Sequence, residues 1–332
     1  MNALFIGGTG VISSACVRRA LAQGIELYVL NRGQTAIRPL PDGVKILPGD
    51  IRDPASVETI LGALTFDVVV DWVAFVPEHI ETDLRLFRGR TGQYVFISSA
   101  SAYRKPLPGL PITESTPLDN PYWQYSRDKI ACEERLLWAY REEKFPVTIV
   151  RPSHTYDCTK LPFYGKYTAL DRMRNGEKVI VHGDGNSLWV LTHHTDFAKG
   201  FVGLLANSRA VGDVFHITSD EVLTWDQIYR IVARAAGVAE PRLVHVPSEL
   251  IAAYDPERGP GLLGDKAHSV IFDNSKIKRV VPDYVASIPF SRGAKEIVAW
   301  YDADPARRTI SAEDNRLFDR IITAYESAWP GD

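Results

Sequence analysis

The sequence has few cysteines, no excess of charge and no long apolar run, and each absence excludes a class of protein. Its three cysteines, Cys16, Cys132 and Cys158, lack the spacing of metal ligands, so we expect neither a metal site nor a disulfide framework. Lys and Arg number 38 against 41 Asp and Glu, and a net charge of −3 argues against a dedicated nucleic-acid binder. No apolar run approaches the ~20 residues that span a bilayer. With no signal-peptide pattern at the N-terminus, we expect a reduced cytoplasmic protein without a membrane partner.

A glycine-rich turn joins a predicted strand over residues 2–6 to a predicted helix over residues 11–23. Such a turn brings backbone N–H groups and the positive end of a helix dipole together, which favours a phosphate or pyrophosphate. Ser13 stands where the usual dinucleotide-binding pattern has its third glycine, so a glycine turn without a ligand is the alternative. The residues that we predict to bind the cofactor here are Gly7, Gly8, Thr9, Gly10, Val11 and Ile12.

Predicted strands and helices alternate from the N-terminus to about residue 150, a pattern typical of a doubly wound parallel sheet. We therefore predict an α/β fold with a Rossmann-like NAD(P)-binding domain over residues 1–155. Residues 156–332 are predicted to form a smaller, mainly substrate-binding domain, with segments that return to the Rossmann sheet. Ligands of such sheets bind at the carboxyl ends of the strands. Further cofactor contacts are predicted at these ends, from Asn31, Arg32, Asp50, Ile51 and Pro152.

The residue at the end of the second strand bears on the choice between NAD and NADP. An acidic residue there would bind the adenosine ribose and repel a 2′-phosphate, but this sequence has Asn31 followed by Arg32. Arg32 could pair with such a phosphate, although it could also be an ordinary solvated arginine. The predicted cofactor is therefore NAD(P), with NADP slightly favoured over NAD.

Tyr125 and Lys129 lie four residues apart at the start of a predicted helix and project from one face. A nearby ammonium would lower the pKa of the tyrosine and make it a general acid or base, and the lysine could also hold a nicotinamide ribose. The hydroxyl of Ser99, after the fifth strand, could bind the same substrate oxygen. A surface Tyr–Lys pair is the alternative, which the preceding glycine turn and serine-ended strand disfavour.

These features resemble the extended short-chain dehydrogenases/reductases, which include NAD-dependent epimerases and dehydratases. The resemblance implies Ser99, Tyr125 and Lys129 as the catalytic triad, and Ser99 rather than Ser98 follows from counting back from Tyr103. The turn after Asn31 also resembles the branch that includes chloroplast stem-loop binding proteins. The matching stretches are Gly7-Gly8-Thr9-Gly10, Gly49-Asp50, Phe96-Ile97-Ser98-Ser99, Thr113-Glu114 with Pro117, Tyr125 to Lys129, Arg151-Pro152 and Asp196-Phe197-Ala198.

Departures from the family pattern reduce the number of reactions that we expect of this chain. The 4,6-dehydratases have an Asp-Glu pair after the catalytic hydroxyl residue, where this chain has Ala100 and Ser101. Dehydration and decarboxylation are therefore disfavoured, and 4-epimerases or simple reductases are favoured. Ser99, Ser101 and His154 are predicted substrate contacts, although His154 could equally be a structural histidine.

The chain lacks a basic residue that the family uses to bind the diphosphate of its substrate. The family's diphosphate-binding arginine is replaced by Trp189, which we predict to stack on a sugar or aromatic face, with a place in the core as the alternative. Arg258, Lys266 and Lys276 are candidate replacements for the clamp. The glycines near Pro260 suggest a mobile loop, and the pair His193-His194 is more typical of structural histidines than of a metal site.

The sequence therefore predicts an NAD(P)-dependent oxidoreductase or epimerase that acts on a sugar or sugar derivative. One alternative is a nucleotide-sugar 4-epimerase with a relocated diphosphate clamp. The other is a non-catalytic RNA-associated protein that reuses the fold, which the acidic balance and the intact Tyr–Lys pair disfavour. The oligomeric state that we consider for this protein is a homodimer.

Overall fold

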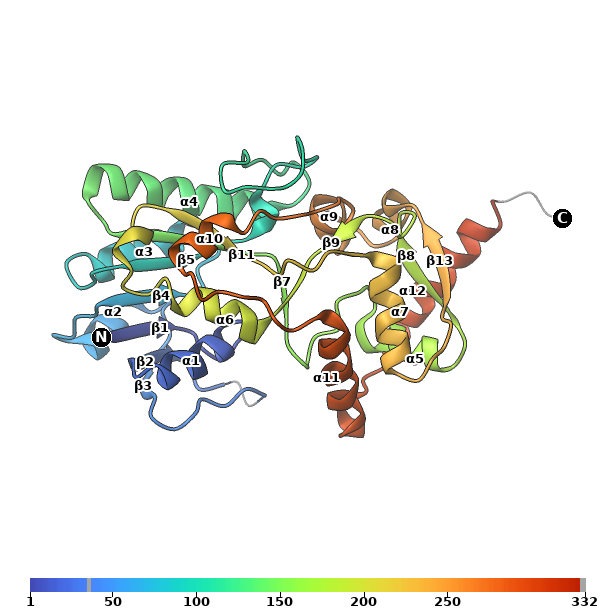
Figure 1. Cartoon of the computed structure of the whole chain (residues 1–332), viewed down its shortest axis with the longest axis horizontal. Helices are drawn as coiled ribbons and strands as arrows, with labels where there is room; N and C mark the ends of the chain where they lie inside the picture. Colours follow the sequence, from blue (N-terminus) through green and yellow to red (C-terminus); the bar gives the residue numbers. More distant parts are fainter. Residues whose placement is uncertain (35–36, 329–332) are drawn as a thin grey trace.

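A seven-stranded, all-parallel sheet forms one half of the molecule, on the left in Figure 1. The computed structural model describes residues 1–34 and 37–328, so residues 329–332 of the predicted second domain lie outside it. The strand order is β11-β6-β5-β4-β1-β2-β3, which confirms the predicted Rossmann-like doubly wound sheet. The strands are β1 (Asn2–Ile6), β2 (Glu26–Asn31), β3 (Lys45–Pro48), β4 (Val68–Asp71), β5 (Tyr94–Ile97), β6 (Val147–Pro152) and β11 (Val214–Ile217).

Alternate side chains of each strand enter two separate apolar layers, one on each face of the sheet. On β1, Ala3 and Phe5 pack into the layer that contains α1 (Ser13–Ala22) and α6 (His194–Val202). Leu4 and Ile6 pack into the opposite layer, which is built with the other three helices. These helices are α2 (Pro54–Leu61), α3 (Pro77–Phe87) and α4 (Gln124–Glu143). Burial on both faces explains the continuous apolar runs at residues 3–6 of β1 and 68–70 of β4.

The second half of the chain builds a smaller body around its own apolar core, on the right in Figure 1. The parallel strands β8 and β13 lie among helices there, while α6, α10 and β11 return to the large sheet. No described helix is long and apolar enough to cross a membrane. The remaining strands are β7 (His154–Tyr156), β8 (Lys178–His182), β9 (Leu188–Trp189), β10 (Leu191–His193), β12 (Leu223–Thr224) and β13 (Arg242–Val246). The remaining helices are α5 (Lys166–Arg174), α7 (Trp225–Ala235), α8 (Ser248–Tyr254), α10 (Ser275–Val280), α11 (Phe290–Asp302) and α12 (Ala312–Glu326).

The glycine-rich segment near Pro260 differs from the mobile loop that its composition suggests. It forms a short helix, α9 (Gly259–Gly261), followed by a π-helical turn, η3 (Leu262–Lys266). A Cβ on Gly264 would lie 2.8 Å from Asn120 Oδ1, and one on Gly259 would lie 2.8 Å from the Ala252 Cβ. Gly259 and Gly264 therefore allow close packing of this segment.

Candidate functional site

Two adjoining cavities lie at the carboxyl ends of the sheet strands. The first, of about 1010 Å³, contains the glycine turn, and we refer to it as the glycine-turn cleft. The second, of about 780 Å³, lies between the two halves of the chain, and we refer to it as the adjoining cavity. The residues that line both are Val11, Ser99, Tyr125, Pro152, Ser153 and Lys160. A ligand in one cavity could thus meet a ligand in the other beside Ser99 and Tyr125.

The glycine turn presents unpaired backbone donors to the cleft. Gly7 and Gly8 have φ angles of +89° and +150°, which favour glycine. The Gly10 N–H donates to Ser13 Oγ at 2.9 Å, so the serine in place of the third glycine closes the turn. The N–H groups of Val11 and Ile12 have no acceptor among the residues that the structure describes. The turn therefore fits the pyrophosphate of a dinucleotide.

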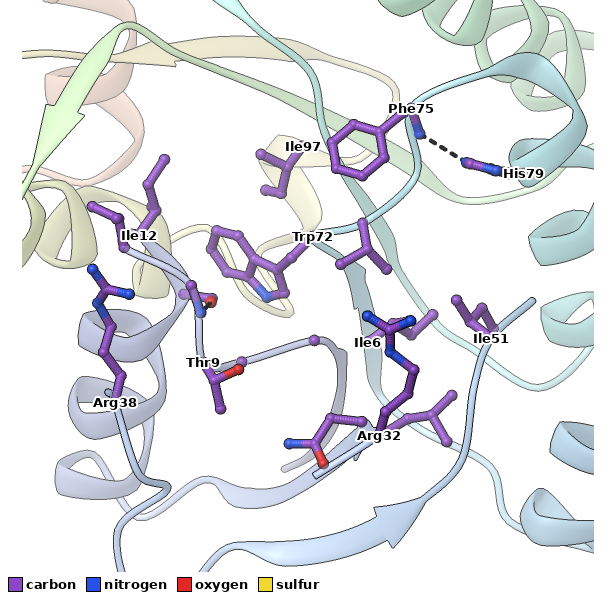
Figure 2. Close-up of a pocket in the computed structure, with 18 of the residues that line it drawn as sticks. Ile6, Thr9, Ile12, Arg32, Arg38, Ile51, Trp72, Phe75, His79 and Ile97 are labelled. Atoms are coloured by element: carbon purple, nitrogen blue, oxygen red, sulfur yellow. Dashed lines mark hydrogen bonds between the residues drawn. The ribbon is translucent and has the colours of Figure 1, made fainter. Parts of the chain in front are cut away.

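A buried indole and an exposed guanidinium complete this cleft (Figure 2). Trp72 Nε1 is a buried donor without an acceptor in the described part of the chain, and its ring projects among the lining residues. The Arg32 guanidinium lies 3.8 Å from Asp50 Oδ2, and both side chains are exposed. Arg38, which the sequence did not suggest, also lines the cleft, and its Nε donates to Asp157 Oδ2 at 2.6 Å. All the residues predicted to contact the cofactor line this cleft.

Tyr125 lies in the first turn of α4 and faces Ser99, which follows β5. The Ser101 N–H donates to Ser99 Oγ at 3.1 Å, and the two hydroxyl oxygens are 2.9 Å apart. Ser126 Oγ then donates to Ser101 Oγ at 2.7 Å. Ser101 therefore fixes the orientation of the Ser99 hydroxyl, and it also lines the adjoining cavity.

Lys129, one turn after Tyr125, is held by backbone carbonyl groups. Its Nζ donates to Ala74 O at 2.6 Å and to Ile97 O at 2.7 Å, and lies 5.8 Å from the centre of the Tyr125 ring. Burial lowers the pKa of Lys129 to about 8. Burial also raises the pKa of Tyr125, although a hydrogen bond from Ser99 opposes this change. The prediction that Lys129 lowers the pKa of Tyr125 is therefore wrong for this structure, because desolvation of the phenol dominates.

His154 and Trp189 form a pair in the wall of the adjoining cavity. The Trp189 Nε1 donates to His154 Nδ1 at 3.0 Å. His154 lines the cavity, whereas Trp189 is only 1% exposed and packs against Trp225. Burial, with further contributions from Lys160 and Lys266, lowers the pKa of His154 well below its usual value. The predicted stacking of Trp189 on a substrate is corrected, because its ring lies in the core, where its Nε1 donates to His154.

The structure separates the three candidate replacements for the diphosphate clamp. Lys276 pairs with Asp213 at the sheet, whereas Arg258 and Lys266 line the adjoining cavity. Arg258 is already held by Asp314 at 2.7 Å, and Lys266 lies 3.7 Å from Asp265. Lys160 also lines this cavity and has no carboxylate within ion-pair distance in the described part of the chain. Sequence reasoning missed Lys160 because no family motif contains it.

The histidine pair is part of the supporting structure. His193 Nε2 lies 3.0 Å from Glu296 Oε2. His194 Nδ1 donates to the Val11 carbonyl at 3.1 Å, and this hydrogen bond attaches the start of α6 to the glycine turn. Burial lowers the pKa of His194 to about 4, which keeps the ring neutral and this donor in place at neutral pH.

The fold and the cleft define a class of dinucleotide-dependent proteins, and comparison with known proteins identifies the family. The model of the "NAD dependent epimerase/dehydratase family" matches residues 3–218, and the chain therefore belongs to this family. The predicted resemblance to extended short-chain dehydrogenases/reductases is confirmed.

Curated relatives include a reductase, an epimerase and a stem-loop binding protein. 2′-Dehydrokanamycin reductase of Streptomyces kanamyceticus is 28% identical over 290 residues, 86% of this chain and 80% of that protein. UDP-glucose 4-epimerase of Lactobacillus helveticus is 34% identical over 169 residues, 46% of this chain and 51% of that protein. Chloroplast stem-loop binding protein of 41 kDa b from Arabidopsis thaliana is 28% identical over 254 residues, 73% of this chain and 65% of that protein.

Solved structures share the whole fold at low identity. dTDP-glucose 4,6-dehydratase from Bacillus anthracis in complex with NAD has a TM-score of 0.73 at 21% identity, covering 92% of this chain and 98% of that chain. UDP-glucose 4-epimerase from Bifidobacterium longum in complex with NAD+ and UDP has a TM-score of 0.71 at 20% identity, covering 92% of this chain and 99% of that chain. At these identities the likeness establishes the fold.

Proposed function

We propose that this chain is an NAD(P)-dependent oxidoreductase or epimerase of a sugar or sugar derivative, with Tyr125 as the proton-transfer residue. The observation that carries the proposal is the position of Ser99 and Tyr125 at the junction of the two cavities. A nicotinamide bound in the glycine-turn cleft would supply or accept a hydride. The adjoining cavity is large enough for a sugar-sized substrate.

Each member of the triad has a distinct part. Because burial raises the pKa of Tyr125, its phenol is protonated at neutral pH and suits donation of a proton to a carbonyl oxygen. Ser99, oriented by Ser101, would hold the same oxygen. Lys129 uses two donors on carbonyl groups, and we assign its remaining donor to the nicotinamide ribose.

We favour NADP over NAD on the evidence of the residues after β2. The position holds Asn31 rather than a carboxylate, and Asn31 Oδ1 accepts the Gly33 N–H at 3.1 Å. The guanidinium of Arg32 is exposed beside the cleft and contacts Asp50 only at 3.8 Å. A 2′-phosphate would therefore meet the Arg32 guanidinium at the end of β2, where Asn31 stands in place of a carboxylate, and would compete with Asp50 for that cation.

A substrate without a nucleotide diphosphate is our first choice, because Trp189 replaces the expected arginine and lies in the core. The relative that covers most of this chain among those named above is a reductase. A nucleotide-sugar 4-epimerase with a relocated clamp is the second candidate. It is supported by Lys160 and Lys266, which line the adjoining cavity, and by the similarity to UDP-glucose 4-epimerase.

The test compares Tyr125→Phe with wild type and with Tyr122→Phe, a matched control at an exposed tyrosine. NADPH and NADH oxidation is followed with a panel of keto sugars and UDP-, GDP- and dTDP-sugars, and nucleotide binding is measured separately by fluorescence. We expect Tyr125→Phe to lose on the order of 10² or more in kcat while nucleotide binding is retained. Full activity of Tyr125→Phe would refute the assignment, and salt-sensitive RNA binding without nucleotide binding would favour the RNA-associated alternative.

A further inference from the structure

The loop that joins β4 to α3 forms one wall of the glycine-turn cleft through Trp72, Val73 and Phe75. Side chains accept three successive backbone N–H groups of this loop. The N–H groups of Val73 and Ala74 donate to Asp71 Oδ1, the latter at 2.8 Å. The Phe75 N–H donates to His79 Nδ1 at 3.0 Å, as Figure 2 shows. Beyond Trp72, whose N–H donates to the Ile6 carbonyl at 3.1 Å, the backbone N–H groups of the loop are therefore held by side chains.

This loop also holds the ammonium group of Lys129. The carbonyl of Ala74 accepts from Lys129 Nζ at 2.6 Å, and the neighbouring N–H of Ala74 is the one that Asp71 accepts. Asp71 thus lies two hydrogen bonds away from Lys129 through a single residue of the loop. Any change in the position of Asp71 would move the carbonyl that orients the lysine.

A second buried acid, Asp83 on α3, lies behind Asp71. Both aspartates are 0% exposed. Tyr94 Oη donates to Asp83 Oδ2 at 2.5 Å, but Asp83 Oδ1 and Asp71 Oδ2 have no donor in the described ranges. The two carboxyl groups interact directly, and burial followed by the charge of Asp71 raises the pKa of Asp83 well above its usual value. One proton between the two orphan oxygens would satisfy both, whereas two ionised carboxylates would repel each other.

We propose that Asp83 is protonated and donates to Asp71, and that this acid pair positions the 72–75 loop and the catalytic lysine. Asp71 and Asp83 are positioning residues, since their oxygens bind the loop and Tyr94 rather than a cavity. The proposal rests on the proposed function for the catalytic role of Lys129, but not for the shared proton. Of the two aspartates, Asp71 is the one whose charge opposes the lowering of the Lys129 pKa by burial.

Two isosteric variants distinguish the roles of the two aspartates. Asp83→Asn mimics a protonated Asp83, because its amide can donate to Asp71 and accept from Tyr94. We expect it to keep the kcat, the thermal midpoint and the pKa of Lys129 close to wild type. Asp71→Asn removes the negative charge that acts on Lys129 and gives the loop N–H groups a weaker amide acceptor, so we expect a lower pKa for Lys129 and, from looser placement of the lysine, a kcat lower by roughly 10- to 100-fold.

The measurements are steady-state kcat and KM, thermal unfolding, and an NMR titration of the ¹⁵N-labelled ammonium of Lys129. The titration and the unfolding need no substrate, so they test the acid pair even if no sugar is turned over. Such a failure of turnover would count against the proposed function alone. Asp83→Ala leaves Asp71 and Tyr94 unpaired, so it shows the effect of losing the acid pair and serves as the comparison for Asp83→Asn. The proposal is overturned if Asp83→Asn is as impaired as Asp83→Ala, or if Asp71→Asn matches wild type in the titration.

Discussion

Removal of the Glu133 carboxylate is expected to destabilise the whole protein, because it would leave a buried guanidinium without its partner. Arg151 Nε donates to Glu133 Oε1 at 2.9 Å and Nη2 to Oε2 at 2.5 Å, and the two side chains are 4% and 0% exposed. The pair joins α4, which carries Tyr125 and Lys129, to the end of β6. Breaking one partner of such a buried pair costs about 3–5 kcal/mol.

The assay is thermal and urea unfolding of Glu133→Ala. At about 2 °C per kcal/mol for a chain of this size, the midpoint should fall by roughly 6–10 °C. Glu81→Ala is the matched control. The Glu81 carboxylate also pairs with an arginine, Arg135 of α4, but the Glu81 side chain is 57% exposed. An exposed pair of this kind contributes about 0–1 kcal/mol. The double variant Arg151→Met with Glu133→Leu removes both charges and should recover much of the loss. Equal, small losses for Glu133→Ala and Glu81→Ala would refute this reasoning.

Two further predictions concern the cofactor and Lys129. Arg32→Ala should weaken NADP binding by about 1.5–3 kcal/mol while NAD binding is unchanged, measured by fluorescence titration at fixed ionic strength; an unchanged NADP affinity would contradict the proposed contact. Lys129 should make stability rise with pH, because burial lowers its native pKa to about 8, below the unfolded value of about 10.4. The unfolded state then binds more protons between these values. Urea unfolding at pH 7 to 10.5 should show this rise in wild type and a flatter profile in Lys129→Met, and identical profiles would count against a buried lysine with a lowered pKa.

Features that depend on local pattern could be predicted from the sequence, and features that depend on distant contacts could not. The strand over residues 2–6 is predicted correctly, because burial on both faces requires a continuous apolar run. The helix α6 ends at Val202, and Gly203 then packs against Val281 from a distant segment. Periodicity carries no information about that contact.

The site shows the same division. Tyr125 and Ser99 follow from their spacing after recognisable elements, and the structure places them together. The raised pKa of Tyr125 depends on burial of its side chain in the folded protein, which spacing does not reveal. Asp83 was missed because a buried acid in an amphipathic helix resembles a surface residue until its partners are placed. Trp189 is identified by its place in the family pattern, and that place does not say which way the ring points.

Isotope transfer tests the central claim most directly, that Tyr125 supplies the proton for a hydride transfer at the junction of the two cavities. Wild type and Tyr125→Phe are each incubated with nicotinamide-deuterated NADPH and the keto sugars of the panel, and the products are analysed by mass spectrometry. The account predicts deuterium on a sugar carbon with wild type and on the order of 10² less with Tyr125→Phe, with nucleotide binding intact in both. Equal deuterium transfer by the two proteins would contradict it.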